Sequence, residues 1–338
     1  MDETVPGFLA WYPTSAGKVP KIATQLTLSD HLGGCMARWG INRLEYLVPA
    51  GLYVIGVPTP DDPVVVTANY KMSYDIVRGA LAGRNVWLLV LETFGINVWC
   101  AAGKGTFGTD ELVRRIEETG LPKVVSHRRL VLPILGATGV AAHEVTKRTG
   151  FSIKYGTIRA SDLPEYLNNG MVTTPAMRAL TFSLYERLVL VPVEVVNARK
   201  SLIILGGLIY LAATLMGGPS AGLAALFSFL GAVLTGVAVA PLLLPWIPGR
   251  SFALKGALAG IAWCVIFYFL TGGGWSTSVT LAAFLALPAI SAFYTLNFTG
   301  CTNFTSRSGV KKEMRISIPV MGGAIFISLF ALVAGRLL

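Results

Sequence analysis

One cysteine of this chain stands in a run of mostly small residues, Asn97-Val98-Trp99-Cys100-Ala101-Ala102-Gly103-Lys104. The apolar stretch 86–91 before it predicts a buried parallel strand, and residues 92–96 predict a strand-to-helix connection. Cys100 is therefore expected near the carboxyl end of a strand, where open α/β sheets bind ligands. Small neighbours allow close approach of a large flat ligand, and a polarisable thiolate suits a transition metal. Cys100 is therefore a candidate metal ligand, although a buried structural thiol is the general default for a cysteine.

Other residues are candidates for contacts with the same ligand. Beside Cys100 they are Asn97, Trp99, Ala101, Ala102, Gly103 and Lys104; after an earlier strand they are Thr67, Asn69 and Tyr70; before a later helix they are Gly136, Thr138 and Gly139. Backbone amides of the last group could hold phosphate or amide groups, although ordinary turn chemistry explains the last two groups equally well. Asn97 is expected to cap a helix, and Trp99 to pack that helix and wall the ligand. Lys104 either contacts the ligand or is a cation at the helix carboxyl end.

The elements that must position these residues alternate along the chain. Strand signals occur at 64–67, 86–91, 123–126 and 152–155, helical patterns at about 73–82, 109–119 and 139–149, and a hairpin signal at 45–57. This alternation predicts an α/β, mostly parallel, Rossmann-like sheet, with a core at about 45–170. Residues 1–44 carry no clear pattern.

The composition divides the chain near Lys200. Hydrophobic residues make up 53% of the 338 residues and charged residues 14%, and the last 138 residues contain a single acid, Glu313. These values predict a soluble domain at 1–170, a juxtamembrane connector at 171–200 and an all-α membrane domain at 201–338. No signal peptide is expected at the amino terminus.

Five transmembrane helices are expected, at about 201–217, 221–247, 254–272, 278–298 and 317–335. The basic residues between spans are Arg250, Lys255, Arg307, Lys311, Lys312 and Arg315, and they fall in two alternate loops. The positive-inside rule then places the amino-terminal domain in the cytoplasm and the carboxyl terminus outside the cytoplasmic membrane.

The four cysteines, Cys35, Cys100, Cys264 and Cys301, are far apart and form no C-x-x-C pair. This spacing argues against a disulfide framework, a zinc knuckle and an iron–sulfur cluster on this chain. A reducing compartment is the simpler expectation.

The octapeptide around Cys100 resembles the cap-helix motif of the HgcA family, the corrinoid proteins of bacterial and archaeal mercury methylation. Its continuation, Gly105-Thr106-Phe107-Gly108-Thr109, agrees with that motif. The upstream run Pro63-Val64-Val65-Val66-Thr67-Ala68-Asn69-Tyr70 resembles the corrinoid domain of the corrinoid iron–sulfur proteins of acetyl-CoA synthesis. By motif, the resemblance covers residues 45–170.

The resemblance implies an anaerobic, corrinoid-dependent methyltransferase. It implies that Cys100 is the catalytic residue and ligates the cobalt of cobalamin or a related corrinoid. It also implies that a methyl group passes from cobalt to Hg(II) to give methylmercury. Transfer as a carbanion or as a radical stays open. The implied partners are HgcB, a ferredoxin-like protein with two [4Fe–4S] clusters, and a folate-type donor, methyltetrahydrofolate or its methyltransferase. Membrane lipids surround the spans, and no nucleic-acid partner is expected.

Two other functions remain open. One is a membrane-bound corrinoid methyl carrier of one-carbon (acetyl-CoA pathway) metabolism. The other is a corrinoid-regulated transporter or sensor, which predicts polar groups inside the spans that the sequence lacks. The membrane domain is expected to be an anchor, with a conduit for Hg(II) or its methylated product as the alternative. Cys264 and Cys301 are either relays for a soft metal or inert buried residues.

Overall fold

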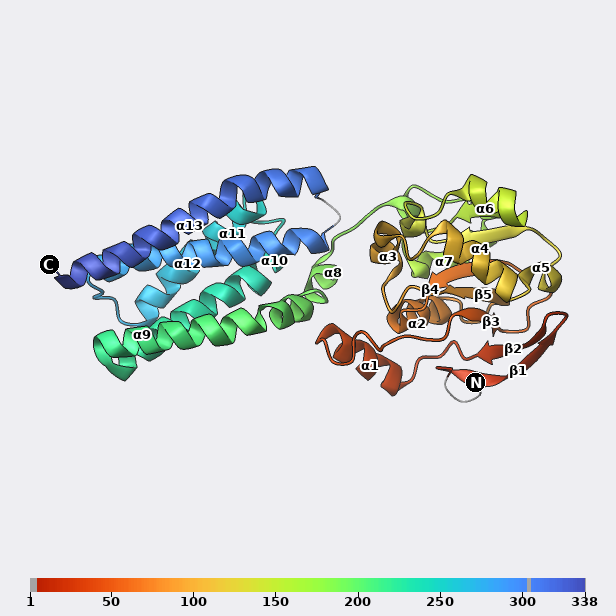
Figure 1. The fold of residues 1–338 in the computed structure, drawn as a ribbon, viewed down its shortest axis with the longest axis horizontal. Coiled ribbons are helices and arrows are strands. Elements are labelled where there is room, and N and C mark those ends of the chain that lie inside the picture. The colour runs from red at the N-terminus through yellow and green to blue at the C-terminus, as the bar shows by residue number, and fades with distance from the viewer. Residues whose placement is uncertain (1–4, 303–304, 338) are drawn as a thin grey trace. The chain divides into compact units, whose positions relative to one another are not determined.

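The computed structural model describes residues 5–302 and 305–337, and the chain divides between Leu180 and Thr181 into two compact units. In the first unit helices flank a sheet, and the second unit is helical (Figure 1). The expected order, an α/β domain followed by a helical region, is confirmed. The division falls inside the segment 171–200 that was expected to be a connector.

The sheet of the first unit has parallel strands on one side and three further strands on the other. Its strands are β1 (Phe8–Thr14), β2 (Gly17–Ile22), β3 (Gly51–Ile55), β4 (Val64–Ala68), β5 (Val86–Leu91), β6 (Arg129–Leu132) and β7 (Ser152–Tyr155), in the order β1-β2-β3-β5-β4-β6-β7. Strands β5, β4, β6 and β7 are parallel, whereas β3 is antiparallel to β5 and β1 is antiparallel to β2. The carboxyl ends of β4, β5 and β6 therefore share one edge.

Apolar residues cover both faces of this sheet, as the continuous apolar strands predict. One face packs with α3 (Val98–Lys104), α4 (Thr109–Glu118), α5 (Leu121–Val124) and α6 (Ala142–Thr149). The other packs with α2 (Lys71–Ala80) and α7 (Leu163–Asn168). Along β4 the faces alternate, with Val64 and Val66 in one cluster and Val65 in the other.

The expected strands and helices are mostly found, with two exceptions. The strand predicted at 123–126 is wrong: Gly120, with φ 61°, follows α4, the short helix α5 begins at Leu121 with Pro122 in its first turn, and β6 starts only at Arg129. The hairpin predicted at 45–57 is also wrong. Only β3 forms there, and its partners are β5 and β2, which lie outside that segment.

Residues 5–44, which carry no clear sequence pattern, form the β1–β2 hairpin and α1 (Leu28–Arg38). A group of buried charges joins α1 to α2. Arg78, which is 0% exposed, bonds Asp75 Oδ1 and Asp30 Oδ2, each at 2.8 Å, and donates to the carbonyl of Ala23 at 2.7 Å. Lys71 bridges the same two acids. Because a buried charge needs complete pairing, this group fixes the amino-terminal segment on the sheet domain.

Among the described residues, four helical stretches of the second unit are long and apolar enough to cross a membrane: Leu184–Leu242, Phe252–Leu270, Thr277–Gly300 and Ser308–Leu337. The helices of this unit are α8 (Leu184–Leu188), α9 (Val191–Leu234), η4 (Thr235–Val239), α10 (Ala240–Leu242), α11 (Phe252–Leu270), α12 (Thr277–Asn297), η5 (Phe298–Cys301) and α13 (Arg307–Leu337).

The expected count of five spans is not confirmed, because 201–217 and 221–247 lie in one stretch. That stretch breaks at Gly218 (φ 81°, ψ 176°). A Cβ on Gly206 would lie 3.2 Å from Leu226, so the two halves pack side by side. Helix α9 already begins at Val191, inside the expected connector.

Small residues allow the helices of the second unit to approach closely. A Cβ on Gly260 would lie 2.7 Å from Cα of Pro288, and one on Gly236 would lie 2.4 Å from the carbonyl oxygen of Ser291. Cys264 is fully buried in an apolar cluster, which agrees with an inert packing role. The side chain of Cys301 lies outside the described residues.

The charge group of Asp30 predicts a pH-dependent stability. Burial disfavours the ionised carboxylate, but hydrogen bonds from Lys71 and Thr27 outweigh burial and hold the pKa of Asp30 well below its usual range. Because the unfolded pKa is about 3.9, this contribution is complete above pH ~4 and is lost as the pH falls further. We expect Asp30→Asn to cost about 3 kcal/mol of stability at pH 7.

The measurement is the thermal unfolding midpoint of the detergent-solubilised chain between about pH 7 and pH 2. The midpoint of Asp30→Asn should be lower at neutral pH and should fall less steeply in acid. Two parallel curves would show that Asp30 does not contribute in this way.

Candidate functional site

Helix α3 presents Cys100 on the surface of the α/β unit. Asn97 is its N-cap, and Oδ1 of Asn97 accepts a hydrogen bond from the backbone N of Cys100 at 2.9 Å. Gly105, with φ 83°, ends the helix, and Lys104 lies in the last turn. The expected capping role of Asn97 is confirmed, and the place of Lys104 agrees with a cation at the carboxyl end. Cys100 is a free, exposed thiol.

The two sides of α3 differ. Ala101 and Ala102 are 0% and 4% exposed and belong to the core cluster of the sheet face, whereas Trp99 is 44% exposed. The side chains of both alanines are therefore packing groups rather than surface groups. Gly103 is different, since a Cβ built there would meet nothing within 4 Å.

The loop containing Gly136, Thr138 and Gly139 lies directly against α3. A Cβ on Gly139 would fall 2.2 Å from the carbonyl oxygen of Phe107 and 2.9 Å from Cα of Ala102. One on Gly136 would fall 2.6 Å from the Phe107 ring. Both glycines thus permit close packing, while Thr138 is exposed. The structure brings this loop and α3 together, as expected of a shared site.

The third group of candidates is buried. Thr67, Asn69 and Tyr70 are 1%, 0% and 6% exposed, and the Tyr70 ring packs edge-on against Tyr46. The register of β4 against β5 nevertheless places Asn69 beside the connection that leads to α3. Ala68 of β4 pairs with Leu91 of β5, so the next residues, Asn69 and Glu92, are neighbours at the carboxyl edge.

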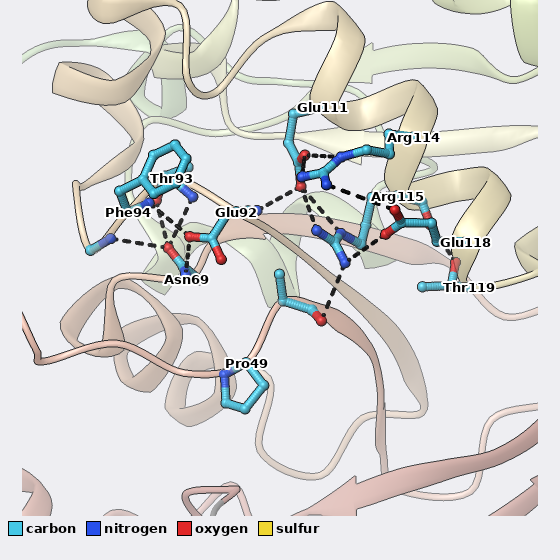
Figure 2. Close-up of polar contacts among 12 residues, drawn as sticks. Pro49, Asn69, Glu92, Thr93, Phe94, Glu111, Arg114, Arg115, Glu118 and Thr119 are labelled. Atoms are coloured by element: carbon cyan, nitrogen blue, oxygen red, sulfur yellow. Dashed lines mark hydrogen bonds and ion pairs between the residues drawn. The ribbon is translucent and has the colours of Figure 1, made fainter. Parts of the chain in front are cut away.

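The carboxamide of Asn69 organises the connection from β5 to α3, as Figure 2 shows. Its Oδ1 accepts hydrogen bonds from Thr93 N at 3.0 Å and from Gly95 N at 3.3 Å. The Thr93 hydroxyl can donate its one proton either to this oxygen, at 2.9 Å, or to the carbonyl of Ile96, at 2.7 Å. Nδ2 of Asn69 donates to Glu92 Oε1 at 2.6 Å, and the same oxygen accepts from Phe94 N at 2.8 Å. The carboxamide of Asn69 therefore forms its hydrogen bonds with other groups of the protein.

Helix α4 holds the end of β5 from the other side. Glu111 Oε1 accepts a hydrogen bond from the backbone N of Glu92 at 2.7 Å and from Arg115 Nη2 at 2.9 Å. Arg114 pairs with the second oxygen of Glu111, and Arg115 also reaches the carbonyl of Ala50 (Figure 2). Sequence reasoning missed Glu92 and Glu111. The signal for Glu92 was a polar residue directly after an apolar strand.

Phe94 adopts an unusual conformation in this connection. Its φ is 55°, a region that costs a non-glycine residue roughly 1–2 kcal/mol. Its side chain is nevertheless 66% exposed. An exposed aromatic residue held in a strained conformation beside the candidate site suits contact with a ligand.

Other features of the described residues do not compete with this edge. A hollow of about 350 Å³ lies near the amino end of β5, lined by residues such as Gly56 and Asn85, and Cys100 is not among its lining residues. Within residues 5–302 and 305–337, no three or more His, Cys, Asp or Glu side chains gather into a metal-binding group.

Comparison with known proteins finds relatives of the segment that contains α3 and the residues around it. Residues 45–167 match the family model of the CO dehydrogenase/acetyl-CoA synthase delta subunit. The acetyl-CoA decarbonylase/synthase complex subunit gamma of Methanopyrus kandleri is 38% identical over 122 residues, which are 36% of this chain and 26% of the relative. The gamma subunit of Methanocaldococcus jannaschii is 35% identical over 129 residues, 38% of this chain and 26% of the relative. The chain spans about a quarter of the length of these curated relatives.

Two glycines at the site provide a matched pair of variants. Gly139→Ala forces a Cβ against backbone atoms and should destabilise the α/β unit by about 1–3 kcal/mol. Gly103→Ala meets open space inside a helix, so stability should stay equal or rise by up to ~1 kcal/mol. Denaturant unfolding of the full chain in detergent measures both. Equal losses would contradict the described packing of α3 on the 136–139 loop.

Proposed function

We propose that the α/β unit binds a corrinoid and carries a methyl group on it, with Cys100 as the protein ligand of the cobalt. The observation that carries this proposal is the exposed thiol of Cys100 at the carboxyl edge of a parallel sheet. Similarity to proteins of acetyl-CoA decarbonylase/synthase complexes supports methyl transfer in one-carbon metabolism more directly than transfer to mercury.

The residues present at this edge fit a flat cofactor with a soft metal centre. Cys100 offers a sulfur ligand, and the exposed aromatic side chains of Phe94 and Trp99 precede it in the chain. Open space over Gly103 leaves the backbone of α3 accessible. When bound, the corrinoid would supply a cobalt centre able to hold a methyl group. Cys100, Trp99, Gly103 and Thr138 are the surface residues proposed to hold it.

The protein's own contribution is to present one sulfur in a fixed direction. Asn97 fixes the first turn of α3 through the backbone N of Cys100, and the buried Ala101 and Ala102 seat the helix on the sheet domain. A thiolate from Cys100 would donate electron density to a bound metal, and such a metal would release a methyl group more readily as a nucleophile. That property favours a soft electrophile as the acceptor.

Hg(II) is therefore the second, narrower candidate for the acceptor, and the exposed Cys100 is the observation in its favour. The octapeptide that carries the resemblance to mercury-methylating corrinoid proteins forms α3 together with its N-cap. In this proposal Hg(II) is a substrate, electrons come from a ferredoxin-like partner, HgcB, and the methyl group comes from a folate-type donor. None of these partners is needed for the corrinoid-binding test.

The second unit is proposed to anchor the α/β unit to the cytoplasmic membrane. Counting the two halves of the stretch broken at Gly218 separately gives five spans. Five spans with cytoplasmic basic loops would leave the α/β unit in the cytoplasm and the carboxyl terminus outside. The close, glycine-mediated packing of these helices supports an anchor over a conduit.

Cys100→Ala tests the ligand assignment. The full chain in detergent micelles is loaded with cobalamin under reducing, anaerobic conditions, and its visible absorption spectrum is recorded. We expect the variant to lose the sulfur-to-cobalt features of the spectrum and to bind cobalamin about tenfold or more weakly. Cys35→Ala, which removes another free exposed thiol, is the matched control. Identical spectra for Cys100→Ala and the unmodified chain would exclude Cys100 as the ligand.

Single-turnover transfer tests the acceptor. The chain loaded with methylcobalamin is mixed anaerobically with Hg(II), and methylmercury is quantified. Transfer in the unmodified chain should be at least about tenfold faster than in Cys100→Ala, a difference of ~1.4 kcal/mol in the barrier. Normal loading without methylmercury would leave the methyl-carrier function and remove mercury as the acceptor.

A further inference from the structure

We propose that Asn69, together with Glu92, is a positioning residue that fixes the connection from β5 to α3 and so sets the direction in which Cys100 is presented. The sequence alone suggested that Asn69 contacts the ligand. The inference rests on the proposed function only where it concerns the cobalt, because the conformation of the connection is a property of the chain itself.

Burial is the first argument. Asn69 is 0% exposed, and its Oδ1 already accepts two backbone hydrogen bonds from the connection and lies 2.9 Å from the Thr93 hydroxyl. A buried carboxamide engaged in this way has no surface to offer a bound molecule. Its removal would leave buried N–H groups without acceptors, which costs more than the bonds themselves contribute.

The second argument is which backbone groups are held. Thr93, Phe94 and Gly95 follow the end of β5, where no neighbouring strand accepts their N–H groups, and Asn69 and Glu92 accept all three. Both Phe94 (φ 55°) and Gly95 (φ 68°) have positive φ values, so the chain reverses sharply here. Figure 2 shows the two side chains meeting at this reversal.

The third argument is the short path to the thiol. The Thr93 backbone N donates to Asn69 Oδ1, and the Thr93 hydroxyl lies 2.7 Å from the carbonyl oxygen of Ile96, to which it can donate its proton. Asn97, the residue after Ile96, caps α3 through Cys100 N. Hydrogen bonds thus link Asn69 through Thr93 to Ile96, the residue directly before the N-cap of α3. A change at Asn69 should reorient the start of α3 without touching any residue of the helix.

The chain offers a matched control at the other end of the same strand. Asn85 directly precedes β5, and its Oδ1 accepts a hydrogen bond from Val57 N at 2.9 Å. Asn85→Ala therefore removes the same kind of bond at the amino edge, away from α3. Glu92→Gln is the conservative variant, because a glutamine oxygen can accept the two bonds that Glu92 Oε1 accepts now.

The first experiment uses the full chain in detergent without cofactor. We expect Asn69→Ala and Glu92→Ala to accelerate hydrogen exchange of residues 93–95 by about tenfold. We also expect the alkylation rate of Cys100 to change by at least about threefold, with that of Cys35 unchanged as an internal reference. Glu92→Gln and Asn85→Ala should behave like the unmodified chain. The proposal is overturned by unchanged exchange and alkylation in both alanine variants, or by equal changes in Asn85→Ala.

The second experiment adds cobalamin and separates positioning from contact. In Asn69→Ala, the bound fraction should lose the sulfur-to-cobalt features of the spectrum. A weaker affinity with an unchanged spectrum of the bound fraction would instead show a direct contact and overturn the inference. If the unmodified chain binds no corrinoid, the proposed function fails, while the measurements without cofactor still decide the role of Asn69.

Discussion

The candidate site depends on how the chain leaves a sheet that is buried on both faces. Strand β5 ends among apolar neighbours, and the next backbone N–H groups would be unsatisfied without acceptors. Asn69 and Glu92 provide those acceptors, and the register of β4 against β5 places them side by side. Glu111 holds the same strand end from α4. The geometry of the sheet is thus passed to α3 through side-chain acceptors rather than through apolar packing alone.

Helix α3 is short, and one of its sides is buried whereas the other is exposed. The inward alanines bring its backbone close to the loop of Gly136 and Gly139, where no larger side chain would fit. The outward side exposes Trp99 and Cys100. The small residues of the octapeptide therefore have two roles. Ala101 and Ala102 pack in the core, whereas Gly103 leaves open space at the surface of the helix.

The sequence predicts the parts of the fold whose signals are local. Strands β4, β5 and β7 and helices α2, α4 and α6 follow from apolar runs and periodicity, and the cap at Asn97 follows from residue type. Strand β6 was misplaced because residues 123–126 favour a strand as much as the true one does, and only Gly120 and Pro122 decide against it. The role of Asn69 could not be predicted, since it depends on Glu92, 23 positions away, being its neighbour across β4 and β5.

The charges on α2 show that the segment similar to other proteins is not the whole of the unit that the structure forms. The segment that matches the family model begins at residue 45, yet Arg78 inside it takes its partners Ala23 and Asp30 from before that point. Strand β2 likewise pairs with β3 from outside the matched segment. A fragment cut at the homology boundary would expose the edge of β3 and leave a guanidinium short of acceptors. The segment that similarity identifies is therefore smaller than the unit that the hydrogen bonds join, and domain borders drawn from similarity would divide that unit.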